Sequence, residues 1–277
     1  MSKIKMRLGH SPDADDAFMF YAMAKGKVNS EDVDFEHVIE DIQSLNNRAM
    51  NKELEVTAMS VHAYTYVQDS YRILSCGASM GEGYGPIVVA KEKIDNLAGK
   101  RIAVPGKLTT AYLLLNIYAQ GFIPVDMPFD KVMDAVVNGE VDAALVIHEG
   151  QLTYKDFGLV MLFDLGVLWE KDTSLPLPLG VNTISRDIEE NLAKEILRLH
   201  KDSIVYGLNN KDEALEYAME YGRGMEFEVG EKFVLMYVND ITVDMGDKGK
   251  KALELLFSKA REKNIITKDV NLDILEC

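Results

Sequence analysis

The segment Val141–Tyr154 is the feature that most constrains the fold of this chain. It contains an unbroken apolar run, Ala143–Ile147, long enough for one fully buried strand. The run ends at His148, so an imidazole is expected at the carboxyl end of that strand, the edge where open α/β sheets bind ligands. His148 is therefore the first candidate for chemistry. The alternative is a histidine that only hydrogen-bonds a neighbouring loop.

Strand and helix patterns alternate over the first half of the chain, and this predicts an α/β fold with βαβ units and parallel sheets. The predicted strands are Ile4–His10, Val33–Ile39, Glu55–Val61, Pro86–Lys91, Arg101–Gly106, Pro124–Phe129 and Asp142–Glu149. The predicted helices between them are Ala14–Lys25, Asp41–Lys52, Ala63–Tyr71, Thr109–Gln120 and Asp130–Asn138, and Asp41 is the predicted cap of the second. Beyond Asp187 helical periodicity dominates, in Ile188–Leu208, Lys211–Tyr221, Glu231–Tyr237 and Lys248–Asn264. His200 is expected on an exposed face of the first of these helices.

Two breaks in the alternation predict two α/β lobes. A glycine-rich stretch, Ser75–Gly85, ends the first series, and a new series begins at Lys100. We predict a large discontinuous lobe of residues 1–88 and 179–277, and a small lobe of residues 89–178 inserted into it. The two crossing segments, Ser75–Gly85 and Leu175–Gly180, would act as hinges over a ligand cleft.

The charge balance narrows the class of partner. The 277 residues include 45 acidic and 30 basic side chains, a net charge of -15. A surface this acidic repels nucleic acid and anionic membranes, but it leaves room for a local site that binds a small anion. The two cysteines, Cys76 and Cys277, are too few for a disulfide framework or a metal cluster.

The amino terminus and the hydropathy predict a cytoplasmic protein. The first residues, Met1–Asp13, lack the apolar core of a secretory signal. No stretch approaches the roughly 18 apolar residues that a membrane span needs. The sequence carries no signal for an oligomeric state.

The turn before the predicted helix Thr109–Gln120 predicts a carboxylate site. The first amides of a helix have no partner within the helix, and two hydroxyls, from Thr109 and Thr110, accompany them here. Lys107 adds a positive charge nearby. A small substrate that carries a carboxylate would fit this site. The alternative is ordinary helix capping by Thr109.

Two serines follow predicted strands. Ser60 offers a hydroxyl to the ligand-binding edge, and no G-x-S-x-G turn marks it as a nucleophile. Ser11 is predicted to cap the next helix and to present its hydroxyl to the same cleft. The carboxylates of Asp13, Asp15 and Asp16 suit a helix start, and their spacing matches neither a calcium loop nor a zinc helix. No metal site is predicted.

Four segments of the chain together resemble the 1,4-dihydroxy-6-naphthoate synthases, which act in the futalosine pathway of menaquinone biosynthesis. The segments are Ser11–Met23, Ala103–Phe122, Val146–Tyr154 and Leu175–Gly180. The resemblance extends in order over Leu8–Gly180 and gives way to generic helices after it. Four motifs in the correct order make the match specific.

The resemblance implies both a fold and an activity. The implied fold is a two-lobed, periplasmic-binding-protein-like type 2 fold with a central ligand cleft. The implied activity is that of a carbon–carbon lyase, which converts cyclic dehypoxanthine futalosine to 1,4-dihydroxy-6-naphthoate without a metal or an organic cofactor.

The resemblance also implies roles for particular residues. The catalytic base of the family is the histidine of an Ile-His-Glu motif, which falls on His148 here. The substrate contacts of the family lie at a strand end and at a Thr-Thr-Ala turn. They fall here on Ala58, Met59, Ser60, Thr109, Thr110 and Ala111.

The start motif departs from the family pattern, which is usually Ser-Pro-Cys-Pro-Asn-Asp. This chain has Asp13 in place of the cysteine and Asp15 in place of the asparagine. Asp15 therefore brings a negative charge to a position near the implied cleft where the family has a neutral amide.

Two other functions compete with this one. Chorismate dehydratase shares the implied fold, but it usually lacks both the Ser-Pro start and the Ile-His-Glu motif. A non-catalytic cytosolic solute-binding protein is the other alternative. A transcriptional regulator is disfavoured, because the sequence shows no helix-turn-helix segment and no basic patch.

Overall fold

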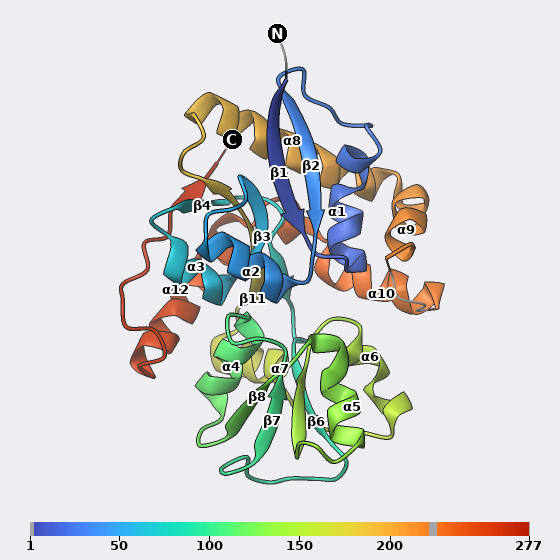
Figure 1. Cartoon of the computed structure of the whole chain (residues 1–277), viewed down its shortest axis with the longest axis vertical. Helices are drawn as coiled ribbons and strands as arrows, with labels where there is room; N and C mark the ends of the chain where they lie inside the picture. Colours follow the sequence, from blue (N-terminus) through green and yellow to red (C-terminus); the bar gives the residue numbers. More distant parts are fainter. Residues whose placement is uncertain (1–2, 222–225, 277) are drawn as a thin grey trace. The chain divides into compact units, whose positions relative to one another are not determined.

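The computed structural model describes residues 3–221 and 226–276 (Figure 1). Contacts within the chain divide it into two compact units. The first unit comprises Met1–Met80, Pro178–Lys250 and Asp269–Cys277, and the second comprises Gly81–Leu177 and Lys251–Lys268. The lobe boundaries predicted after residues 88 and 178 stay a prediction.

In the described part of the chain, the first unit contains a seven-stranded sheet in the order β12-β4-β11-β3-β1-β2, with β5 beside β11. Its strands are β1 (Ile4–His10), β2 (Val33–Ile39), β3 (Val56–Ser60), β4 (Tyr71–Leu74), β5 (Ser79–Gly81), β11 (Leu177–Ser185) and β12 (Ile274–Leu275). Strand β1 runs parallel to β2 and β3, whereas β11 runs antiparallel to β3 and β4. The prediction of a parallel sheet is therefore wrong for this unit, whose sheet is mixed. A parallel pair needs a βαβ crossover, and in the described structure β11 is not joined to its neighbours in this way.

Helices cover the sheet of the first unit (Figure 1). The helices that lie wholly in this unit are α1 (Ala14–Ala24), α2 (Ile42–Met50), α3 (Val61–Val67), α8 (Glu190–Asn209), α9 (Lys211–Met219), α10 (Phe227–Tyr237) and α11 (Asp240–Val243). Helix α12 (Gly246–Glu262) begins in this unit, and its residues from Lys251 onward are assigned to the second unit. None of the helices in the described ranges combines the length and the hydropathy that a membrane crossing requires.

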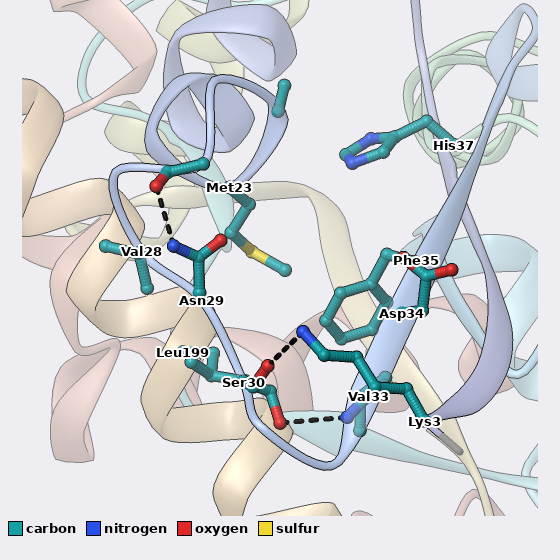
Figure 2. Close-up of a pocket in the computed structure, with 12 residues that line it drawn as sticks. Lys3, Met23, Val28, Asn29, Ser30, Val33, Asp34, Phe35, His37 and Leu199 are labelled. Atoms are coloured by element: carbon teal, nitrogen blue, oxygen red, sulfur yellow. Dashed lines mark hydrogen bonds between the residues drawn. The ribbon is translucent and has the colours of Figure 1, made fainter.

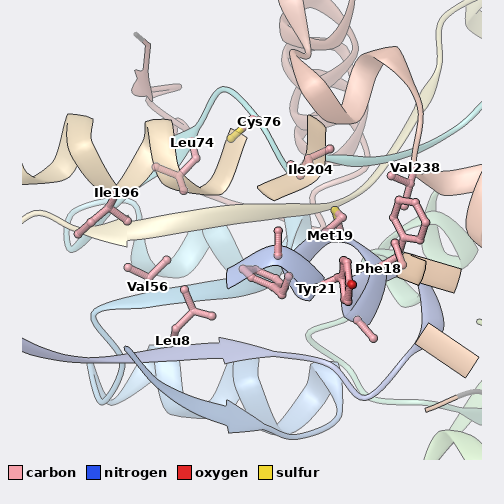
Figure 3. Packing of buried hydrophobic residues seen from close by; sticks show 14 of the residues in the cluster. Leu8, Phe18, Met19, Tyr21, Val56, Leu74, Cys76, Ile196, Ile204 and Val238 are labelled. Carbon is pink, nitrogen blue, oxygen red and sulfur yellow. The ribbon is translucent and has the colours of Figure 1, made fainter. Parts of the chain in front are cut away.

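The main core of the first unit joins α1 and α8 to the sheet. Figure 3 shows Phe18 of α1, Ile196 of α8, and Leu8 and Val56 of the sheet among its members, all of them buried. A smaller cluster, centred on Leu45 of α2, packs against β3. Burial of such apolar surface, at about 25 cal/mol per Å², supplies the main stabilisation of a unit of this kind.

Two helix starts were predicted from capping residues, and one prediction is confirmed. The carboxylate of Asp41 accepts hydrogen bonds from the backbone N–H groups of Gln43 and Ser44 at 3.0 and 3.1 Å. The predicted cap of α1 by Ser11 is wrong, because Asp13 is the N-cap residue. Ser11 lies two residues too early, and its hydroxyl donates instead to the carboxylate of Asp13 at 2.5 Å.

The second unit contains, among the described residues, a five-stranded sheet in the order β10-β6-β9-β7-β8. Its strands are β6 (Ile87–Ala90), β7 (Arg101–Val104), β8 (Ile123–Asp126), β9 (Ala143–Val146) and β10 (Val160–Asp164). Its helices include α4 (Thr110–Tyr118), α5 (Val132–Val137), α6 (Gly150–Thr153) and α7 (Leu165–Thr173), with 3-10 turns at Phe129–Lys131 and Tyr154–Phe157. Strand β9 is buried throughout, as predicted, and runs parallel to β7. It runs antiparallel to β6, which in turn is antiparallel to β10, so the second sheet is also mixed rather than parallel as predicted.

One helix is shorter than predicted. The helix expected over Ala63–Tyr71 ends at Val67, and Tyr71 begins β4 instead. The Tyr71 side chain is buried, and its hydroxyl donates to the carbonyl of Leu54 at 2.8 Å. This long-range contact, which a local pattern does not reveal, decides the structure at that position.

Candidate active site

His148 lies just beyond the carboxyl end of β9, in a strained backbone conformation. Its φ is +55°, in the left-handed region that a residue with a Cβ adopts only at a cost. Its side chain is partly buried, and its ring meets the Phe129 ring edge-on, with centroids 5.2 Å apart. Strained residues of this kind concentrate at functional sites.

Close packing behind His148 maintains the turn. The carbonyl of His148 accepts a hydrogen bond from the backbone N–H of Gln151 at 3.1 Å. A Cβ placed on Gly150 would lie 2.5 Å from Cγ1 of Val146, so only glycine lets α6 start this close to β9. The turn that carries His148 is thus defined by backbone contacts on the strand itself.

The predicted carboxylate turn lies at the same edge of this sheet. Strands β7 and β9 are parallel neighbours, so their carboxyl ends lie at one edge, and β7 leads to the start of α4. Thr110 and Ala111 are buried there, whereas Lys107 is exposed. The second unit therefore brings His148 and the start of α4 to a common edge.

The hydroxyl of Thr109 caps the amino-terminal end of α4. It accepts a hydrogen bond from the backbone N–H of Tyr112 at 3.2 Å and donates to the carbonyl of Gly106 at 2.7 Å. This is the capping role that was the alternative for Thr109. Any contact of Thr109 with a substrate would have to use other atoms.

The strand-end residues of the first unit are buried and gathered at one edge. Ala58, Met59 and Ser60 close β3, and Ser60 lies opposite Gly180 of the antiparallel β11. Since β1 and β3 are parallel, Ser11 beyond the end of β1 belongs to the same edge as Ser60. The structure thus groups the predicted residues of this unit at one sheet edge.

Asn46 is a residue that the sequence reasoning missed. It comes from the buried face of α2, is 0% exposed, and makes two hydrogen bonds to Ser60. The sequence did contain a signal for Asn46, because this polar residue lies beside Leu45 and one turn before Ala49 on the apolar stripe of the helix. A polar side chain on such a stripe requires a partner.

Carboxylates surround Ser11. Its backbone N–H donates to Asp16 at 2.7 Å, and its hydroxyl donates to Asp13. Burial of Asp16, together with the charge of Asp13, raises the pKa of Asp16 above its ordinary value of 3.8. Asp15, the substitution in the start motif, is buried and accepts a hydrogen bond from the hydroxyl of Ser79 at 3.4 Å.

A column of aromatic rings lies behind this edge. His10 and His200 both stack on Phe20, with centroids 4.7 and 4.6 Å away. Burial lowers the pKa of His10 to about 4 and that of His200 to about 3. The prediction that His200 lies on an exposed helix face is wrong, since its ring is buried against α1. Among the described residues, no group of three or more His, Cys, Asp or Glu side chains is arranged to hold a metal ion.

One cavity lies elsewhere in the first unit. Figure 2 shows it between the end of α1, the loop that follows, and β2, with a volume of about 250 Å³. Lys3, Phe35 and His37 are among its lining residues, and Lys3 donates to the carbonyl of Ser30 at 2.8 Å. The predicted site residues are not part of its lining.

Comparison with known proteins gives a matching family model and several similar proteins. Residues 6–262 match a family model described as menaquinone biosynthesis. A 1,4-dihydroxy-6-naphtoate synthase of Thermus thermophilus is 42% identical over 260 residues, which are 94% of this chain and 95% of the relative. A crystal structure of an Archaeoglobus fulgidus protein has a TM-score of 0.92 and 53% identity, and the match covers 95% of this chain and 98% of that one.

A more distant match shows the fold alone. The periplasmic aliphatic sulphonate binding protein SsuA of Escherichia coli has a TM-score of 0.67 at 10% identity. The match covers 98% of this chain and 91% of that one. The predicted α/β, periplasmic-binding-protein-like fold is confirmed.

Proposed function

Since the chain belongs to the menaquinone biosynthesis family, we propose that it is a 1,4-dihydroxy-6-naphthoate synthase. As a carbon–carbon lyase, it converts cyclic dehypoxanthine futalosine to 1,4-dihydroxy-6-naphthoate. The 42% identity with the Thermus thermophilus enzyme over nearly the whole chain is the observation that carries this conclusion.

We propose His148 as the general base. The reaction needs a proton removed from a carbon beside a carbonyl, and the gain of aromaticity drives the cleavage that follows. Histidine is the side chain best suited to accept a proton near neutral pH. The position of His148 beyond β9 and its left-handed backbone support this role.

We propose that the sheet edge of each unit, taken by itself, carries candidate contacts for a small, carboxylate-bearing substrate. In the second unit the contacts are Lys107, Thr109, Thr110 and Ala111, and in the first they are Ser11, Ala58, Met59 and Ser60. The N-terminal amides of the nine-residue helix α4 favour an anion, and Thr110 stands in its first turn. Because its hydroxyl is engaged in capping, Thr109 would contribute through its backbone.

The purified protein tests this function directly. Incubated with cyclic dehypoxanthine futalosine, it should form 1,4-dihydroxy-6-naphthoate, which is followed by its absorbance. Turnover of chorismate instead would identify a chorismate dehydratase. Thermal stabilisation by the futalosine substrate without any product would identify a solute-binding protein.

We further propose that the protein acts in the cytoplasm, as a biosynthetic enzyme. Fractionation of cells that express the full chain tests this, and recovery of the activity with the membrane or the exported fraction would overturn it.

A further inference from the structure

The side chain of Asn46 holds Ser60 by two hydrogen bonds. Its Oδ1 accepts the backbone N–H of Ser60 at 2.9 Å, and its Nδ2 donates to Oγ of Ser60 at 3.0 Å. Asn46 is 0% exposed and Ser60 is 3% exposed, so both bonds are shielded from water. Buried bonds of this kind are costly to break.

The chemistry of the groups determines the direction of both bonds. A backbone N–H can only donate, so the amide atom that faces it must be the oxygen. The amide nitrogen then faces the Ser60 hydroxyl and donates to it. The hydroxyl is therefore an acceptor toward Asn46, and its own hydrogen must point elsewhere.

That hydrogen has no acceptor among residues 3–221 and 226–276. Ser60 is the N-cap residue of α3, a position where a serine side chain usually accepts an amide of the helix. Here it makes no such capping bond. The hydroxyl of Ser60 is thus fixed by α2 and remains available as a donor at the strand edge.

We propose that Asn46 is a positioning residue that makes the Ser60 hydroxyl a hydrogen-bond donor to an oxygen of the substrate. The inference rests on the proposed function only in that Ser60 contacts the substrate. The atom that Ser60 recognises is an acceptor, a carboxylate or carbonyl oxygen. An analogue with an amino group at that position meets a second donor and binds poorly.

The variant Asn46→Asp tests the direction of the bond. When ionised, the new carboxylate still accepts the Ser60 N–H, but it also accepts the Ser60 hydroxyl hydrogen and withdraws it from the substrate. The KM for cyclic dehypoxanthine futalosine should then rise roughly 10- to 100-fold, the loss expected for one hydrogen bond to a charged group. The expected change in kcat is much smaller.

The pH profile of this variant separates orientation from general damage. A protonated carboxyl can donate to the Ser60 hydroxyl as the amide does, so the KM of the variant should approach that of the wild type at low pH and rise as the carboxyl ionises. A KM that is raised equally at every pH would overturn the proposed orientation.

Two further variants complete the test. Asn47→Asp makes the same chemical change at the exposed neighbouring position and should leave KM unchanged. In a Ser60→Ala background, Asn46→Ala should add nothing to the rise in KM, because Asn46 acts only through Ser60. Additive effects, or a normal KM for Asn46→Asp at high pH, would disprove the proposal.

The outcome is distinguishable from failure of the proposed function. If the wild-type protein forms no naphthoate from the futalosine substrate, the function is wrong. If it does and the Asn46 variants keep a normal KM, the function stands and the positioning role is wrong. Should Asn46→Asp fail to fold above the pKa of its carboxyl, the comparison of Ser60→Ala with the Ser60→Ala, Asn46→Ala double variant decides the question.

Discussion

The Nδ1–H of His37 donates a hydrogen bond to Nε2 of His10 across 3.1 Å. The direction follows from the other side of the His10 ring, where Nδ1 faces the carbonyl of Ser11 at 3.1 Å and must carry a hydrogen. A neutral His10 then has only a lone pair at Nε2. Protonation of His10 puts a hydrogen on its Nε2, so the contact then requires His37 to carry its own hydrogen on Nε2 and to accept at Nδ1. Acid that protonates both rings breaks the contact.

We expect the free energy of unfolding to decrease as the pH falls below 6.5. His10 and His200 have an ordinary pKa of 6.5, which burial lowers to about 4 and about 3 in the folded protein. Below pH 6.5 the unfolded chain therefore binds more protons than the folded one. For each extra proton bound by the unfolded chain, the free energy of unfolding falls by about 1.4 kcal/mol per pH unit. Urea unfolding from pH 4.5 to 7.5 measures the slope.

A matched variant isolates one of these histidines. Neither ring nitrogen of His200 has a hydrogen-bond partner in the described structure, so His200→Leu should change stability at pH 7.5 by less than about 1.5 kcal/mol. It should also make the loss of stability toward acid shallower. An unchanged slope would contradict the assignment of this titration to His200.

Asp16 should act in the opposite direction. Burial raises its pKa above 3.8, so the folded protein holds a proton that the unfolded chain releases. The stabilisation from this group is complete below pH 3.8 and is lost as the pH rises through the raised pKa. Asp16→Asn should therefore gain stability relative to the wild type as the pH rises, and a difference independent of pH would contradict this.

Replacement of His148 should abolish turnover without unfolding the protein. Loss of a general base typically lowers the rate by about 10²–10⁴. We expect that decrease in kcat for His148→Asn, with a thermal unfolding temperature close to that of the wild type, because the side chain is only partly buried. Near-normal turnover would remove His148 from the mechanism.

The backbone strain at His148 should appear as a difference between two inactive variants. With φ at +55°, His148→Gly should be more stable than His148→Ala by about 1 kcal/mol, since glycine adopts this conformation without a Cβ clash. Chemical denaturation of both variants measures the difference. Equal stabilities would mean that the turn relaxes in the free protein.

The glycine behind His148 should be required for both stability and activity. Gly150→Ala would bring a methyl group 2.5 Å from Cγ1 of Val146, and overpacking of this kind costs about 1–3 kcal/mol. It should also lower kcat by shifting the His148 turn. Val146→Ala in the same chain should restore part of both losses, and the absence of any recovery would argue against this contact.

Elements with strong local signals were predictable from the sequence. β1 and β2 have the predicted bounds, and Asp41 caps α2 as its position before that helix predicts. The buried strand before His148 was also predictable, because an apolar run of that length leaves few alternatives. Local sequence patterns were enough to predict an element wherever its decisive contacts come from neighbouring residues in the chain.

Positions decided by distant partners were not predictable. Tyr71 was expected in a helix, but its bond to Leu54 belongs to a strand, and His200 was expected at the surface, but Phe20 of another helix buries it. Asn46 carried no functional signal until the structure placed its amide against Ser60. Each outcome depends on a residue at least 14 positions away in the chain.

The sequence by itself determined the fold class, the family resemblance and the place of His148 after a buried strand, because periodicity and motif order are properties of neighbouring residues. Only the tertiary structure decided the left-handed backbone at His148, the mixed order of the sheets and the direction of the Ser60 hydroxyl. These three features depend on which segments meet in space. A buried donor, acceptor or charge needs a partner, and here the partners lie far away along the chain.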